Sequence, residues 1–250
     1  MKIALVLLSL WVQEGAKENP LQPLTKIAKL LDEKAAAFLK GTPPPEAFAP
    51  WRSPIRNEKA LEELREQFKS QEVASLSCFW IEVEFDFLVE GKPTYHLRTI
   101  VQMTQEETAF LDFRGSKAEN ESSRAYPPAG YKNEIAPFGE VGTSILAVVK
   151  AKDESHLPFA DPDKLSKLFP EKFHNEIRKS IEKSRKNVAQ ALTEIAELKV
   201  DEVRIRVDDF AFVARDASGG FRGFFECEFE VHDNGSTEIE LGKLRMPKSK

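Results

Sequence analysis

The stretch Ser75–Val89 reads SLSCFWIEVEFDFLV and decides the fold class. Apolar and acidic residues alternate along it with a period of two, which is typical of a strand with one buried and one exposed face. The inner face is predicted to carry Phe79, Ile81, Val83, Phe85, Phe87 and Val89. The outer face is predicted to carry Glu82, Glu84 and Asp86. We therefore expect an antiparallel sheet, because parallel strands are usually buried on both faces.

A short turn at 90–92 predicts the register of the hairpin that follows. A three-residue loop places Asp86 opposite His96 and Glu84 opposite Arg98, so two complementary charge pairs form on the outer face. His96 beside Asp86 has the arrangement of an oriented imidazole, but no candidate nucleophile lies near it in the sequence. The same register pairs apolar residues on the inner face, namely Phe87 with Tyr95 and Phe85 with Leu97.

A later strand changes its alternation partway along. Ile205 and Val207 have odd numbers, whereas Phe210 and Phe212 have even numbers. Both pairs can point inward only if one extra residue is inserted, which predicts a β-bulge at 208–209. Pairing from a turn at 216–219 then places the following residues opposite each other: Phe212 and Phe221, Val207 and Phe225, Ile205 and Cys227, Arg206 and Glu226, Arg204 and Glu228.

The whole pattern predicts an α+β protein made of two halves, each with helices followed by an antiparallel meander, and with sheets packed on helices. The expected segments are a signal peptide at 1–16, a helix and proline-rich connector at 17–56, a helix with a four-stranded sheet at 57–152, and helices with a three-stranded sheet at 153–250. In the segment 57–152 a long loop at 115–142 precedes a fourth strand at 143–150. This order is similar to cystatin-like and other helix–helix–meander folds, a likeness of arrangement that implies no function.

The first residues resemble a secretory leader. Lys2 gives a basic start, and the run Ile3–Val12 is almost wholly apolar. This run is too short for a transmembrane helix, which needs about twenty apolar residues. Ala16 is the candidate cleavage residue, and a buried first strand is the alternative interpretation. We therefore expect a secreted or periplasmic protein without stable membrane insertion.

Composition and motifs exclude several function classes. The chain has 250 residues, 31% of them charged, and a net charge of −5 with acids and bases interspersed, which argues against nucleic-acid binding. The sequence contains no phosphate-binding GxxxxGK[ST] or GxGxxG motif, no GxSxG nucleophile motif and no Cys/His zinc spacing. We therefore expect no cofactor, and we name no catalytic residue.

The two cysteines lie far apart in the sequence. Cys227 shares its predicted inward face with Phe225, whereas Cys78 has the alternation of Trp80 and would point outward. A disulfide requires the two Cβ atoms to approach within about 4 Å. The sequence therefore predicts two free thiols on different sheet faces.

Glutamates gather on the last two predicted strands. A three-residue turn at 233–235 would place Glu230 opposite Glu238 and Glu228 opposite Glu240, and like charges directly opposite each other are destabilising. A divalent cation such as Ca²⁺ would relieve this repulsion, so these four glutamates form a candidate metal site. A turn at 234–236 would instead place His232 opposite Glu238, and a solvated charged face is the simpler interpretation.

Apolar residues on the nominally outer face form a second candidate site. Trp80, Leu88 and Ile100 lie there, and Trp51 in the proline-rich connector could join them. We interpret the chain as an exported, non-enzymatic protein that binds another protein or a small apolar ligand at these residues. Two alternatives stay open, a cation-dependent or hydrolytic enzyme using the carboxylate-rich face and a structural domain of a cell-envelope assembly.

Overall fold

The computed structural model describes residues 19–43, 58–117, 136–152, 154–231 and 237–245. The predicted leader at 1–16, Trp51 and the central part of the predicted long loop lie outside these residues. The described chain is a mixture of helices and antiparallel strands, which confirms the α+β class.

The two predicted meanders join in one sheet. The first meander comprises β1 (Ser75–Val89), β2 (Lys92–Met103) and β3 (Thr108–Lys117). The second comprises β4 (Glu202–Arg215), β5 (Phe221–Val231) and β6 (Thr237–Arg245). The six strands lie in the order β3-β2-β1-β4-β5-β6, and the antiparallel pair β1–β4 links the meanders.

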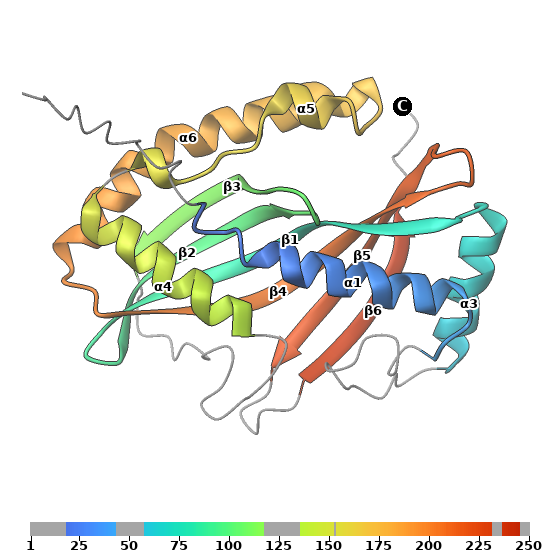
Figure 1. Ribbon diagram of the computed structural model, residues 1–250, viewed down its shortest axis with the longest axis horizontal. Helices are drawn as coiled ribbons and strands as arrows, with labels where there is room; N and C mark the ends of the chain where they lie inside the picture. Colours follow the sequence, from blue (N-terminus) through green and yellow to red (C-terminus); the bar gives the residue numbers. More distant parts are fainter. Residues whose placement is uncertain (1–18, 44–57, 118–135, 153, 232–236, 246–250) are drawn as a thin grey trace, which may run out of the picture.

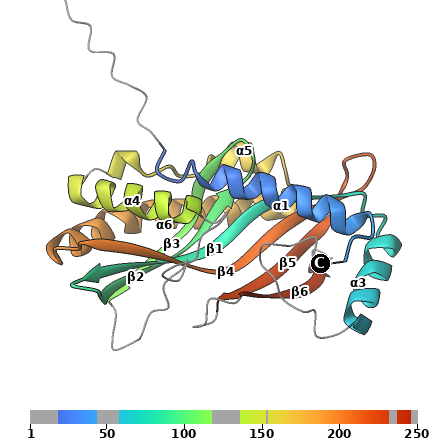
Figure 2. The same ribbon diagram turned by 60° about the horizontal axis from the view of Figure 1, so that its bottom comes forward.

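Helices α1 (Leu24–Leu39) and α4 (Ala136–Ala151) lie side by side on one face of the sheet (Figures 1 and 2). Helix α6 (His174–Glu197) runs along the edge strand β3, preceded by the short helices η1 (Glu154–His156), α5 (Pro162–Ser166) and η2 (Glu171–Phe173). Helix α3 (Glu58–Ser70) lies at the other edge, where the Gln67 amide group bonds both the N–H and the C=O of Leu244 in β6. Both edge strands are thus at least partly covered, which limits unwanted strand pairing.

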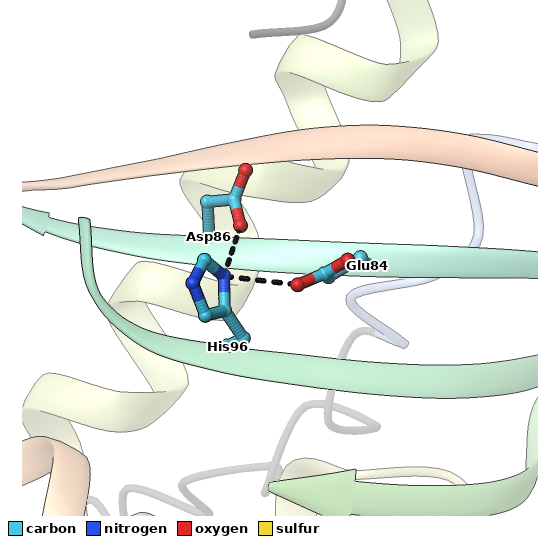
Figure 3. Close-up of side chains that lie close together, drawn as sticks. All are labelled: Glu84, Asp86 and His96. Carbon is cyan, nitrogen blue, oxygen red and sulfur yellow. Dashed lines mark hydrogen bonds and ion pairs between the residues drawn. The ribbon is translucent and has the colours of Figure 1, made fainter. Parts of the chain in front are cut away.

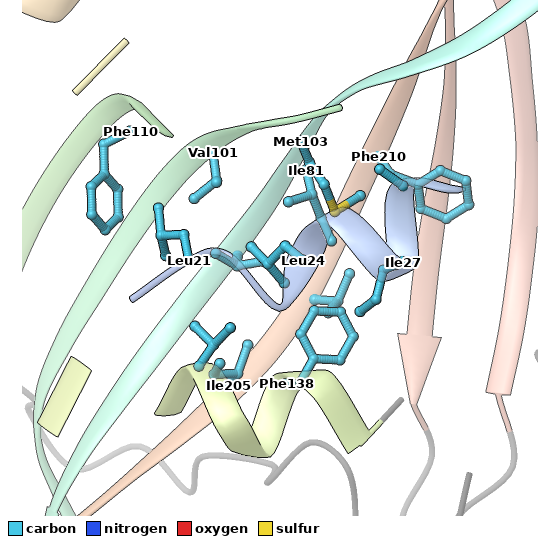
Figure 4. Packing of buried hydrophobic residues seen from close by; sticks show 14 of the residues in the cluster. Leu21, Leu24, Ile27, Ile81, Val101, Met103, Phe110, Phe138, Ile205 and Phe210 are labelled. Atoms are coloured by element: carbon cyan, nitrogen blue, oxygen red, sulfur yellow. The ribbon is translucent and has the colours of Figure 1, made fainter. Parts of the chain in front are cut away.

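The main core lies between the sheet and the helices α1 and α4. Leu24, Ile27, Leu31 and Phe38 recur at helical spacing, so they form one stripe of α1 and are buried. Figure 4 shows Leu24 and Ile27 of this stripe and Phe138 of α4 in one cluster with Ile81 of β1 and Ile205 and Phe210 of β4. Helix α6 adds its second half to the same core through Val188, Leu192 and Ile195.

The prediction of a strand at 143–150 is wrong, because these residues belong to α4. Short apolar runs such as TSILAVVK fit a buried strand and a buried helix equally well when read without their flanks. The buried residues of this helix are spaced by three or four along most of its length: Phe138, Val141, Ile145, Val148 and Val149. The loop predicted at 115–142 is wrong at both ends, since β3 ends at Lys117 and α4 begins at Ala136, and residues 118–135 lie outside the described residues.

Two bulges set which residues of the central pair β1–β4 face the core. The register skips Asp208 of β4, which confirms the bulge predicted at 208–209. It also skips Phe79 of β1, so Phe79 lies in a second cluster with Trp80, while Cys78 lies in the main core. The Cys78 N–H donates to the carboxylate of Asp32 in α1 at 2.5 Å, which ties this bulge to the helix.

The two cysteines are free, as predicted, but both are buried, and the predicted reason was wrong. Because of the Phe79 bulge, Cys78 joins Cys227 in the main core instead of pointing to the outer face. Burial raises the pKa of both thiols well above the ordinary value, so each behaves as a small apolar side chain.

Candidate functional site

The outer face of β1 meets charged residues of both neighbouring strands. The predicted pairs Asp86 with His96 and Glu84 with Arg98 are confirmed in the β1–β2 register. The predicted partners of the β4 arginines were wrong, because this part of β4 pairs with β1 and not with β5. Arg206 lies opposite Glu84, and Arg204 lies opposite Asp86.

Glu84, Asp86, His96 and Arg206 form a closed group that we name the His96 cluster. His96 Nδ1 lies 2.5 Å from Asp86 Oδ1 and 2.9 Å from Glu84 Oε1 (Figure 3). Arg206 contacts the remaining oxygens, Glu84 Oε2 at 2.5 Å and Asp86 Oδ2 at 3.1 Å. Each carboxylate therefore presents one oxygen to the imidazole and the other to the guanidinium group.

The His96 cluster is withdrawn from water. Asp86 is fully buried, and His96 is only 8% exposed. Burial raises the pKa of Asp86, although Arg206 and His96 both favour its charged form. Among the described residues, His96 Nε2 is buried without a hydrogen-bond partner. The arrangement can hold a proton or a cation at Nδ1, where three ligand atoms converge.

A row of acidic residues crosses the neighbouring strands. The register places Glu82, Asp209, Glu228 and Glu240 opposite one another across β1, β4, β5 and β6, and we name them the acidic row. Burial raises the pKa of Asp209 to about 6, and the charges of Glu82 and Glu228 contribute to the same increase.

The predicted register of the last two strands is confirmed, since Glu230 lies opposite Glu238 and Glu228 opposite Glu240. The side chains of Glu230, Glu238 and Glu240 lie outside the described part of the structure, as do residues 232–236. Metal binding by these four glutamates therefore stays a prediction.

A pocket of about 210 Å³ lies between the outer face of the first meander and α6, and we name it the α6 pocket. It brings together Trp80 and Ile100, two of the predicted ligand-binding residues. Leu88 is fully buried farther along β1 and does not line it, and Trp51 lies outside the described residues. The pocket walls also include Leu111, Phe169, Phe173, Ile177 and Phe224.

Aromatic contacts build the rigid end of the α6 pocket. The rings of Phe79 and Phe169 lie 4.8 Å apart at 67°, and Phe169 and Phe224 lie 5.5 Å apart. The Phe79–Phe169 contact is edge-to-face, an arrangement that aromatic rings prefer, whereas the rings of Phe169 and Phe224 are tilted by 35°. Phe173 and Ile177 are four residues apart in the sequence, a spacing that is equally typical of a filled core, because periodicity cannot distinguish a pocket wall from a filled core.

Few polar groups border the α6 pocket, namely Asp112, Glu176 and Ser180. The Asp112 carboxylate is already engaged by the Phe113 N–H and the Ser184 hydroxyl group, and it pairs with Arg114. The pocket can therefore select a ligand mainly by apolar contact.

No protein-family model matches this chain, and neither a curated protein nor a solved structure matches it. Of the helices in the described ranges, none is both long enough and apolar enough to cross a membrane.

Proposed function

We propose that this chain is an exported, non-enzymatic binding protein that takes a small apolar ligand in the α6 pocket. One observation carries the proposal: Trp80 and Ile100, on a sheet face with acidic neighbours, border an apolar pocket together with α6. A face that only contacted solvent would not require these side chains.

The size of the α6 pocket indicates the size of its ligand. Its volume of about 210 Å³ is below the roughly 300–1,000 Å³ of pockets for drug-sized molecules. A single aromatic ring or a short aliphatic chain fits such a space. Burying this apolar surface supplies roughly 25 cal/mol per Å², from which the loss of ligand freedom must be subtracted, so we expect modest affinity.

A probe and a pair of variants test the pocket. We expect toluene to raise the melting temperature of the full chain by about 3 °C at ten times its Kd. Ile177→Trp fills the pocket and should abolish this increase, whereas Lys179→Trp, on the exposed side of the same helix, should retain it. An equal increase in Ile177→Trp would show that toluene binds elsewhere and would contradict the proposal.

Export rests on the leader-like residues 1–16. N-terminal sequencing of protein secreted by a bacterial host should find a mature end near Lys17. An intact Met1 on cytoplasmic protein would contradict the export proposal and leave the pocket proposal unaffected.

The alternative, a cation-dependent or hydrolytic enzyme using the carboxylate-rich face, is supported in its cation-dependent form by a different observation, the convergence of ligand atoms in the His96 cluster. The cystatin-like arrangement and the role in a cell-envelope assembly stay predictions.

A further inference from the structure

We propose that the His96 cluster binds one divalent transition-metal ion, with His96 Nδ1, Asp86 Oδ1 and Glu84 Oε1 as its ligands. These atoms lie within 4.8 Å of one another, and Figure 3 shows both carboxylates directed at the same ring nitrogen. The site is separate from the α6 pocket, and neither proposal depends on the other.

Hydrogen bonding alone does not satisfy two carboxylate oxygens at one ring nitrogen. Nδ1 carries at most one proton, yet two carboxylate oxygens lie 2.5 and 2.9 Å from it. One proton cannot point along both directions, so at least one contact is bent. A metal ion accepts all the ligand atoms at once. With bonds of about 2.0–2.2 Å in tetrahedral geometry it would hold them about 3.3–3.6 Å apart, so the ligand atoms would move outward by less than about 1 Å.

Charge balance favours a cation in the same place. Glu84 and Asp86 contribute two negative charges and Arg206 one positive charge, so a neutral His96 leaves the cluster with an excess negative charge. An uncompensated charge is costly where water is excluded, and Asp86 is fully buried. A divalent ion compensates this charge without protonating the imidazole.

Arg206 has the position of a supporting residue. It holds Glu84 Oε2 and Asp86 Oδ2, the two oxygens that do not face His96. Groups that bond the outer oxygens of metal-binding carboxylates orient the inner oxygens toward the metal. His96 Nε2 has no partner among the described residues, so it can take up the ring proton when Nδ1 binds the ion.

The ligand types indicate the class of ion. An imidazole nitrogen with two carboxylates suits Zn²⁺ and other first-row transition metals, whereas Ca²⁺ and Mg²⁺ prefer oxygen ligands alone. Three protein ligands leave a coordination position open, as in catalytic rather than structural zinc sites.

Calorimetric titration of the full chain with Zn²⁺, after removal of metals with a chelator, tests the site. We expect one ion per chain, and His96→Gln should weaken binding at least about 100-fold. His174→Gln is the matched control, because His174 lies on α6 and bonds the Phe169 carbonyl group; it should bind Zn²⁺ as the wild type does. Circular dichroism establishes that both variants are folded.

Absence of binding at 100-fold excess of Zn²⁺, or equal affinity in folded His96→Gln, would overturn the proposal. If His96→Gln does not fold, nitrogen NMR of ¹⁵N-histidine-labelled wild type decides the question. Zn²⁺ should shift one Nδ1 resonance to the position of a metal ligand and place the proton on Nε2 of the same ring. No change in any Nδ1 resonance would equally contradict the site.

Discussion

Trp80 and Asp86 lie on the same face of β1, yet their surroundings are opposite in character. Around Trp80 the face is apolar and α6 covers it without filling the space. Around Asp86 the face is charged, and every carboxylate of the His96 cluster is paired. The contrast shows that alternation along a strand determines which side a residue faces. The neighbouring strands and helices determine whether its surroundings on that side are apolar or charged.

The largest expected effect concerns the main core, which lies on the other side of β1 from both the apolar part and the charged part of this face. Phe85 lies between Glu84 and Asp86 in sequence, points to the opposite side of β1 and is fully buried. Phe85→Ala should lower the free energy of unfolding by about 3–5 kcal/mol, because it leaves a large cavity. Ile177→Ala should cost about 1 kcal/mol, since Ile177 is half-buried and already borders the space of the α6 pocket.

Denaturant titration measures both variants. Similar losses at the two positions would show that the wall of the α6 pocket is packed like the core, and the contrast between a filled and an unfilled region would be wrong.

The second prediction concerns the charged half. Asp86→Ala should cost about 3 kcal/mol, because it removes a fully buried carboxylate and leaves Arg206 Nε and one side of His96 Nδ1 without the group that they contact. Glu202→Ala is the control: Glu202 pairs with Arg204 at 2.6 Å but is exposed, so it should change stability by less than about 1 kcal/mol. If chemical denaturation gave equal losses in the free energy of unfolding for Asp86→Ala and Glu202→Ala, burial would not strengthen the contacts of the His96 cluster.

Much of this face could be predicted from the sequence, because local rules fix it. The alternation of β1, the pair Asp86–His96 and the bulge at Asp208 follow from parity and from one short turn. The Phe79 bulge could not be predicted in the same way, since an extra residue within an apolar stretch (CFWI) leaves no break in polarity.

The role of Arg206 was missed for a different reason. No turn connects β1 to β4, which are separated by more than a hundred residues, so the sequence offered only the nearer strand β5 as a partner. The residue that completes the His96 cluster thus depends on long-range pairing. The α6 pocket was missed in part because Phe173 and Ile177 have the spacing of core residues.

The smallest expected effect lies in the acidic row, where Asp209 stands between Glu82 and Glu228. Its pKa is raised to about 6 in the folded protein from an ordinary value of 3.8. Between these two values the folded state keeps a proton that the unfolded state has released, so stability falls as the pH rises through this window. Above pH 6 Asp209 is ionised in both the folded and the unfolded state, and the full loss of stability caused by its raised pKa persists.

Asp209→Asn carries no charge at any of these pH values. We therefore expect this variant to be more stable than the wild type at pH 7 by about 1 kcal/mol, a value reduced for solvent screening because Asp209 is only partly buried. The difference should disappear near pH 4, where the wild-type carboxyl group is protonated as well. Glu182→Gln, on the exposed side of α6, is the control and should show no such dependence on pH. Urea titrations at both pH values measure the difference; a gain in stability that is equal at pH 4 and pH 7 would mean that the repulsion within the acidic row is not its cause.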